Sequence, residues 1–238
     1  MDGRTWYDLA GDSTEDQLFS VKDSRAPYPL TQEEQALLFQ ELPDHLARMA
    51  LFKVNTGTRE QEVCNLRWDY EVMVPELKTS VFLIPGDLVK NGEERLVVLN
   101  RVAKSVIDSQ RGVHPTHVFT RTIKDGHPSR LTKMYNTAWK AARERAADEW
   151  AKRHSEPAPE GFRQVRVHDL KHTFGRRLRA AGVTFEDRQD LLGHKSGRIT
   201  THYSQAELTS LIAAADKVCD TESRKTPATY GYGGGRRS

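Results

Sequence analysis

Residues 167–204 read VHDLKHTFGRRLRAAGVTFEDRQDLLGHKSGRITTHYS, and this stretch decides the interpretation of the chain. Its spacing predicts one helix over residues 167–181 and another over residues 185–192, each followed directly by a glycine that can end it. Polar residues of catalytic type accompany both predicted helices. They are His168, Lys171, His194 and Tyr203.

Two upstream segments carry further candidates. Residues 56–68 read TGTREQEVCNLRW, in which Arg59 and Glu62 follow a helix-ending Thr-Gly pair. Residues 88–99 read LVKNGEERLVVL, and Lys90 lies beside an Asn-Gly pair that predicts a β-hairpin. Taken singly, each candidate has an ordinary explanation, such as a surface arginine, a turn lysine or a packed tyrosine.

A metal site is the alternative interpretation of the paired histidines. His168 and His172 are one helical turn apart, so both could face one ion. The glutamate that follows the first histidine in a zinc-binding HExxH helix is absent, because Asp169 takes that place. We therefore expect neither a metal site nor a cofactor.

The rest of the chain predicts an α+β fold that is mostly helical, with a small antiparallel sheet. Thr31 and Glu34 form a capping-box pattern at the start of the first helix. The expected strands are 72–74, 81–84, 95–99 and 118–119. The other expected helices are 31–42, 44–56, one carrying 62–68, 102–107, 131–153 and 206–218, with a loop at 154–162. We expect a linker or lead-in over 1–30, one catalytic domain over 31–217 and a flexible basic tail over 218–238.

Composition narrows the function classes. The net charge of +3 and 37% apolar residues fit a soluble globular domain, and two cysteines are too few for a disulfide framework. No apolar run could span a membrane, so the expected location is cytoplasmic and associated with the nucleoid. A basic cluster suits phosphate contacts, although a solvated helix face would look the same. Its members are Arg163, Arg166, Lys171, Arg176, Arg177 and Arg179.

Together, and in this order, the segments resemble the boxes of the tyrosine recombinase, or phage integrase, family. TGTREQEVCNLRW resembles the family's first arginine box, and HDLKHTF resembles its His-x-x-Arg box. LLGHKSGRITTHYS resembles the Leu-Gly-His box that precedes the nucleophilic tyrosine. The resemblance covers about residues 31–217 and implies the tyrosine recombinase catalytic-domain fold and site-specific cutting and rejoining of DNA.

The resemblance also implies a role for each residue. Arg59 would clamp the phosphate that is attacked, with Glu62 supporting its geometry, and Tyr203 would form a 3′-phosphotyrosyl bond. Lys90 would protonate the leaving 5′ oxygen. The residues that would donate hydrogen bonds or help move a proton are His168 and His194.

One position departs from the family pattern, because Lys171 stands where the second arginine is usual. Lysine keeps the charge but loses the bidentate fork. Three interpretations follow. In the first, which is the interpretation we favour, lysine works here as a point charge. In the second, a nearby arginine such as Arg166 or Arg176 contributes, and in the third the enzyme is slow or inactive. The third would make the chain a catalytically silent DNA-binding regulator, and a type IB topoisomerase is a further alternative.

The family usually carries an N-terminal helical domain that grips the other face of DNA, and residues 1–30 are too short for one. We therefore expect a fragment or a trimmed form with weak, salt-dependent DNA affinity. The expected partners are double-stranded attachment-site DNA, further copies of the chain in a tetramer on DNA, and an accessory directionality factor. The apolar face of helix 206–218 could serve its own core or a neighbouring subunit.

Overall fold

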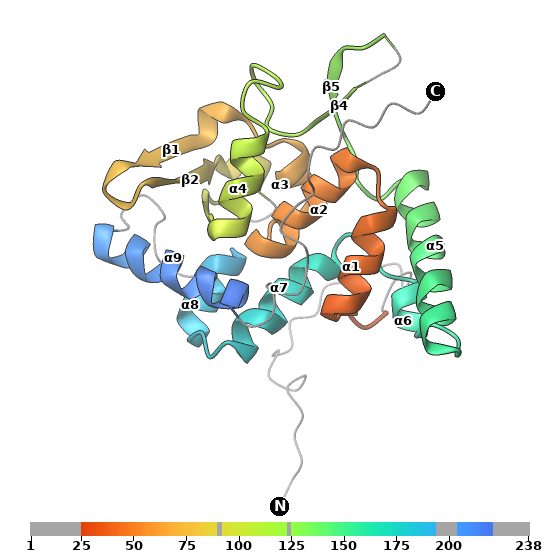
Figure 1. Ribbon diagram of the computed structural model, residues 1–238. Helices are drawn as coiled ribbons and strands as arrows, with labels where there is room; N and C mark the ends of the chain where they lie inside the picture. The colour runs from red at the N-terminus through yellow and green to blue at the C-terminus, as the bar shows by residue number, and fades with distance from the viewer. Residues whose placement is uncertain (1–24, 90–91, 123–124, 194–203, 221–238) are drawn as a thin grey trace, which may run out of the picture.

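A computed structural model describes residues 25–89, 92–122, 125–193 and 204–220 (Figure 1). Helix α1 (Gln32–Glu41) begins as predicted, since Thr31 Oγ1 accepts the Glu34 amide and the Glu34 carboxylate accepts the Thr31 amide. Helix α2 (Asp44–Thr56) ends at Gly57 with φ +63°. This left-handed residue turns the chain directly into helix α3 (Glu60–Cys64).

The predicted antiparallel sheet is confirmed. Its strands are β1 (Glu71–Val74), β2 (Thr79–Ile84) and β3 (Arg95–Val98), in the order β1-β2-β3. Ile84 pairs with Arg95, so the first residue of β3 lies opposite the last residue of β2. The connection between them is longer than a two-residue Asn-Gly turn, because it includes the short helical turn Gly86–Leu88.

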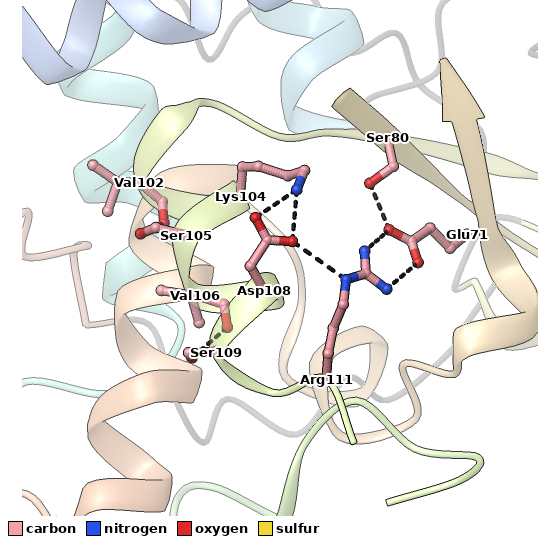
Figure 2. A network of polar contacts seen from close by, with 9 residues as sticks. All are labelled: Glu71, Ser80, Val102, Lys104, Ser105, Val106, Asp108, Ser109 and Arg111. Carbon is pink, nitrogen blue, oxygen red and sulfur yellow. Dashed lines mark hydrogen bonds and ion pairs between the residues drawn. The ribbon is translucent and has the colours of Figure 1, made fainter. Parts of the chain in front are cut away.

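Figure 2 shows how a polar network ties this sheet to helix α4 (Arg101–Ser109). The Arg111 guanidinium donates to both Glu71 carboxylate oxygens, at 2.6 and 3.0 Å, and to Asp108 at 3.3 Å. Ser80 donates to the same Glu71 carboxylate at 2.6 Å. This bidentate pairing orients the sheet against α4, and with it the strand that carries Arg95.

Three expectations in the middle of the chain were wrong. Residues 118–119 are buried but not a strand; the strand there is β4 (Thr120–Thr122), which pairs with an unpredicted partner, β5 (Pro128–Arg130). The helix expected over 131–153 begins later, as α5 (Thr137–His154), because the Asn136 side chain caps it by accepting the Trp139 amide. A one-turn helix, α6 (Glu160–Arg163), also lies in the predicted loop.

The last three helices bring the C-terminal part of the chain against α2 and the sheet (Figure 1). Helices α7 (Asp169–Ala180) and α8 (Phe185–Leu192) have the predicted bounds within two residues. Helix α9 (Gln205–Asp220) packs on its own chain through Leu211 and Ala215, which are fully buried. The α9 residue Asp216 also accepts the Arg101 amide at 2.8 Å. These contacts show that this helix packs on its own core.

Candidate active site

Arg59 lies on the short loop between α2 and α3, where two other segments approach closely. A Cβ atom at Gly57 would fall 2.9 Å from side-chain atoms of both Leu192 and Phe174. Two features therefore require glycine at position 57: the positive φ angle and the close contact with α7 and α8. This packing places the loop beside the segments that carry the downstream boxes, and about a quarter of the Arg59 side chain stays exposed.

Glu62 organises the site. Its carboxylate accepts the Arg59 amide at 2.6 Å and the Arg59 guanidinium at 2.8 Å, and it also accepts a hydrogen bond from Arg95. Burial alone would raise the pKa of Glu62, but Arg95 and the hydrogen bonds from Arg59 outweigh it and hold the pKa below its usual range. The carboxylate thus stays charged and holds the Arg59 fork through hydrogen bonds.

Lys171 lies on the first turn of α7, with 6% of its surface exposed. Its ammonium donates to the Leu192 carbonyl at 2.7 Å, which ties α7 to the end of α8. Burial, followed by the charges of Arg95 and Arg59, lowers the pKa of Lys171 to about 7. Arg95 and Arg59, rather than Arg166 or Arg176, are therefore the arginines whose charges act most strongly on this lysine.

His168 precedes α7 and meets His172 edge to face, with ring centroids 4.9 Å apart. Partial burial, then the Lys53 charge, lowers the pKa of His168 to about 4. The imidazole is accordingly neutral near pH 7 and offers one donor and one acceptor nitrogen. No group of three or more potential metal ligands occurs among the residues that the structure describes.

Lys90, His194 and Tyr203 lie outside the described residues. Gly193, which directly precedes His194, has φ +60°, and a Cβ atom there would fall 2.5 Å from Arg95 Nε. The structure therefore brings Arg59, Glu62 and Lys171 together, and it places Gly193 against Arg95 beside them.

Two buried cations in this cluster were not among the sequence candidates. Arg95 is 3% exposed and Lys53 is fully buried. Lys53 donates to the Thr58 carbonyl, and Arg95 Nη2 donates to the Gly57 carbonyl at 3.1 Å, so both hold the backbone of the Arg59 loop. A signal existed for Lys53, because it lies four residues after the buried Met49 and so occupies the apolar face of α2.

The burial of Lys53 has a testable cost. Burial lowers its pKa from 10.5 to about 7, so between these values the unfolded chain binds more protons and stability rises with pH. We expect Lys53→Met to be more stable than the parent at pH 6.5 by a few kcal/mol, since one pKa unit is worth about 1.4 kcal/mol. The difference in the free energy of unfolding between the two proteins should become smaller toward pH 9.5. Urea denaturation of both proteins between pH 6.5 and 9.5 measures this difference.

Lys152→Met is the matched control, because that lysine side chain is 76% exposed and its replacement should leave the pH dependence unchanged. A Lys53→Met protein that is less stable than the parent by a constant amount across the range would contradict this expectation. It would show that the Lys53 amino group stabilises the fold whether it is protonated or neutral.

Comparison with known proteins agrees with this arrangement. The family model described as "Phage integrase family" matches residues 29–209. The integrase of Salmonella phage P22 is 28% identical over 183 residues, which cover 74% of this chain and 43% of that protein. The chain thus spans under half the length of this curated relative.

Two solved structures share the fold. A lambda integrase dimer bound to a COC′ core site has a TM-score of 0.52 and 17% identity, covering 80% of this chain and 49% of that one. The integrase from mycobacterium phage Brujita has a TM-score of 0.51 and 17% identity, covering 88% of this chain and 62% of that one.

The helices pack mainly on one another with a small antiparallel sheet at one side, and Arg59, Glu62 and Lys171 lie at one junction; this is a tyrosine recombinase catalytic-domain fold. The family match covers residues 29–209, from before α1 to the first residues of α9. The chain belongs to the phage integrase family. No helix in the described part of the chain is long and apolar enough to cross a membrane.

Proposed function

We propose that this chain is the catalytic part of a site-specific DNA recombinase, an integrase of a phage or another mobile element. The observation that carries the proposal is the anchored Arg59. Its guanidinium and amide are both held by Glu62, and part of its side chain reaches solvent where a phosphate could approach. An arginine oriented in this way can hold two oxygens of a phosphodiester at once.

The charge balance supports the same proposal. One buried carboxylate, that of Glu62, faces the cationic side chains of Arg59, Arg95, Lys53 and Lys171. The net positive charge of such a site can stabilise the bound phosphate and the negative charge that develops on its oxygens in the transition state. Fixed cations of this kind would let the reaction proceed without a metal ion.

In the proposed reaction the Tyr203 hydroxyl oxygen attacks the phosphorus in line, and the bond to the 5′ oxygen breaks. The tyrosine becomes esterified to the 3′ phosphate, and Lys90 donates a proton to the 5′ oxygen. The tyrosine proton leaves through a neutral imidazole, for which His168 and His194 are the candidates. Attack of a 5′ hydroxyl on the phosphotyrosyl ester reverses these steps and rejoins the strand.

Covalent capture tests this function. The chain is incubated with a pool of randomised duplexes, each nicked so that a short cut strand can diffuse away, and attached DNA is recovered under denaturing conditions. Enrichment of a defined sequence over successive rounds supports a site-specific recombinase. Transfer of the attached strand to a second duplex supports recombination, whereas relaxation of supercoiled plasmid without transfer would favour a type IB topoisomerase. DNA binding without attachment would favour a silent regulator.

Lys171 should give the reaction a pH dependence that arginine would remove. Its pKa of about 7 means that its positive charge is present below pH 7 and is lost as the pH rises above it. For the free enzyme we expect kcat/KM for attachment to fall about 25-fold between pH 6.5 and 8.5, as one essential proton with a pKa of about 7 is lost. In Lys171→Arg, which stays charged, this fall should largely disappear, and the rate at pH 8.5 should exceed that of the parent.

Lys140→Arg, a lysine exposed on α5, is the matched control and should keep the parental pH profile. A Lys171→Arg protein that is slower at every pH would instead show that the site is built around the smaller ammonium.

The assembly is also a proposal. Residues 31–217 would form the catalytic domain, with 1–30 as a lead-in and 218–238 as a basic tail. The proposed partners are double-stranded attachment-site DNA, other copies of the chain in a tetramer on that DNA, and an accessory directionality factor.

A further inference from the structure

Arg95 connects three segments that are far apart in the sequence. Its Nη1 donates to the Glu62 carboxylate and its Nη2 donates to the Gly57 carbonyl at 3.1 Å. On its remaining edge, Nε lies against Gly193, where a Cβ atom would come within 2.5 Å. One planar group therefore touches α3, the loop before Arg59 and the residue before His194.

Keeping an arginine here costs free energy. Arg95 is 3% exposed, and burial lowers its pKa to about 10, although Glu62 opposes this shift. Its Nε has no hydrogen-bond partner among the described residues. Buried ion pairs can often be replaced by apolar side chains without loss of stability, so the burial of this arginine is not explained by stability alone.

The geometry suggests what Arg95 does for Arg59. One Glu62 oxygen accepts the Arg59 guanidinium, and the other accepts both the Arg59 amide and Arg95. Arg95 thus prevents the carboxylate from rotating and shares its negative charge. Without Arg95, Glu62 would neutralise Arg59 more completely and leave less positive charge for a phosphate.

We propose that Arg95 is a positioning residue of the active site. It orients Arg59 through Glu62 and the Gly57 carbonyl, and the same guanidinium contacts Gly193 and fixes its position. The inference rests on the proposed recombinase function. Arg95 acts through Arg59 and through Gly193, and it does not itself touch the DNA.

The first test compares single-turnover covalent attachment by the parent and by Arg95→Met, using the nicked duplex recovered by covalent capture. We expect a loss of about 100-fold, the size that a misplacement of catalytic groups by about 1 Å can produce. Non-covalent affinity for the intact duplex, measured in the Tyr203→Phe background, should change less than threefold. Arg95→Lys should recover only part of the rate, because one ammonium cannot serve both Gly57 and Glu62.

Arg143→Met is the matched control. Like Arg95, Arg143 has a buried Nε without a hydrogen-bond partner among the described residues, but its Nη1 donates to the Tyr135 hydroxyl at 3.5 Å and not to Glu62 or Gly57. Its replacement removes an arginine with a similarly buried Nε and should leave the attachment rate of the folded protein within about twofold.

A modified substrate separates positioning of Arg59 from a general structural role. Replacing the cleaved phosphodiester with a methylphosphonate removes the negative charge that Arg59 is proposed to neutralise. If Arg95 acts through Arg59, the penalty of Arg95→Met should shrink from about 100-fold to less than tenfold on this DNA. Equal penalties on both substrates would overturn the inference.

Glycine substitutions test the contact with Gly193 without removing the arginine. Gly193→Ala adds a methyl group against Arg95 at φ +60°, whereas Gly182→Ala adds one at φ +70° with nothing within 4 Å. Both carry similar backbone strain, so only Gly193→Ala should slow attachment. The loss of attachment rate caused by Gly193→Ala should be smaller in the Arg95→Met background, because the guanidinium that the added methyl group would displace is absent there.

The outcomes distinguish the two proposals. Attachment by a folded Arg95→Met protein within threefold of the parent rate, or equal effects of the two alanine substitutions, would overturn the role of Arg95 while the recombinase function stands. Absence of attachment by the parent itself would overturn the proposed function instead.

Discussion

Replacing Tyr203 with phenylalanine is expected to abolish covalent attachment to DNA, with a loss of at least about 10⁴-fold, as for the removal of other enzymatic nucleophiles. Phenylalanine keeps the ring but has no oxygen to attack the phosphorus. Non-covalent DNA affinity should change little, because one hydroxyl contributes little beside the phosphate contacts. Denaturing electrophoresis after incubation with the nicked duplex measures the attachment, and a gel shift measures the binding.

Tyr230→Phe and Tyr232→Phe are the controls, since these tyrosines lie in the Gly-rich C-terminal stretch. Both variants should attach to DNA at the parental rate. Attachment that survives in Tyr203→Phe but disappears when Tyr230 or Tyr232 is replaced would move the nucleophile to that stretch.

Replacing Arg59 with glutamine is expected to slow attachment by about 10³-fold, the lower end of the loss seen when an arginine that stabilises a phosphoryl transition state is removed. Glutamine can still hydrogen-bond, but it carries no charge and has no fork. Glu62 would then keep Arg95 as its only cationic hydrogen-bond partner among the described residues, so the local charge would become less positive. Single-turnover attachment at saturating DNA isolates this effect from binding.

Arg67→Gln is the matched control for Arg59→Gln. Arg67 lies in the same box, eight residues after Arg59; its side chain is 41% exposed and pairs with Asp69 instead of a buried carboxylate. Exposed pairs of this kind contribute about 0–1 kcal/mol, so we expect less than a twofold change in rate. An Arg59→Gln rate within tenfold of the parent would show that another cation, such as Lys171, holds the phosphate.

Local patterns predicted the elements that local interactions form. The capping box at Thr31, the left-handed Gly57 and the glycine after α8 are short-range features, and each is observed where the sequence placed it. The β4–β5 hairpin was missed because its strands are three residues long and carry no alternating apolar pattern. The start of α5 was placed too early because the apolar residues before Asn136 belong to the core without being helical.

The residues of the candidate site also fall into two groups, those that the sequence named and those that only the structure revealed. By itself the sequence determined the family, and through the resemblance of its boxes it named Arg59, Glu62 and Lys171 as candidate residues of one site. Only the tertiary structure decided that Arg95 and Lys53 join them, since nothing in the strand RLVV or the helix ALFKVN identifies these cations as partners of Glu62 and the Arg59 loop. The physical reason is that burial and charge pairing depend on which distant segments pack together. Arg95 acquires its partners only when β3, α3 and the end of α8 meet, and that meeting depends on the packing of the whole core.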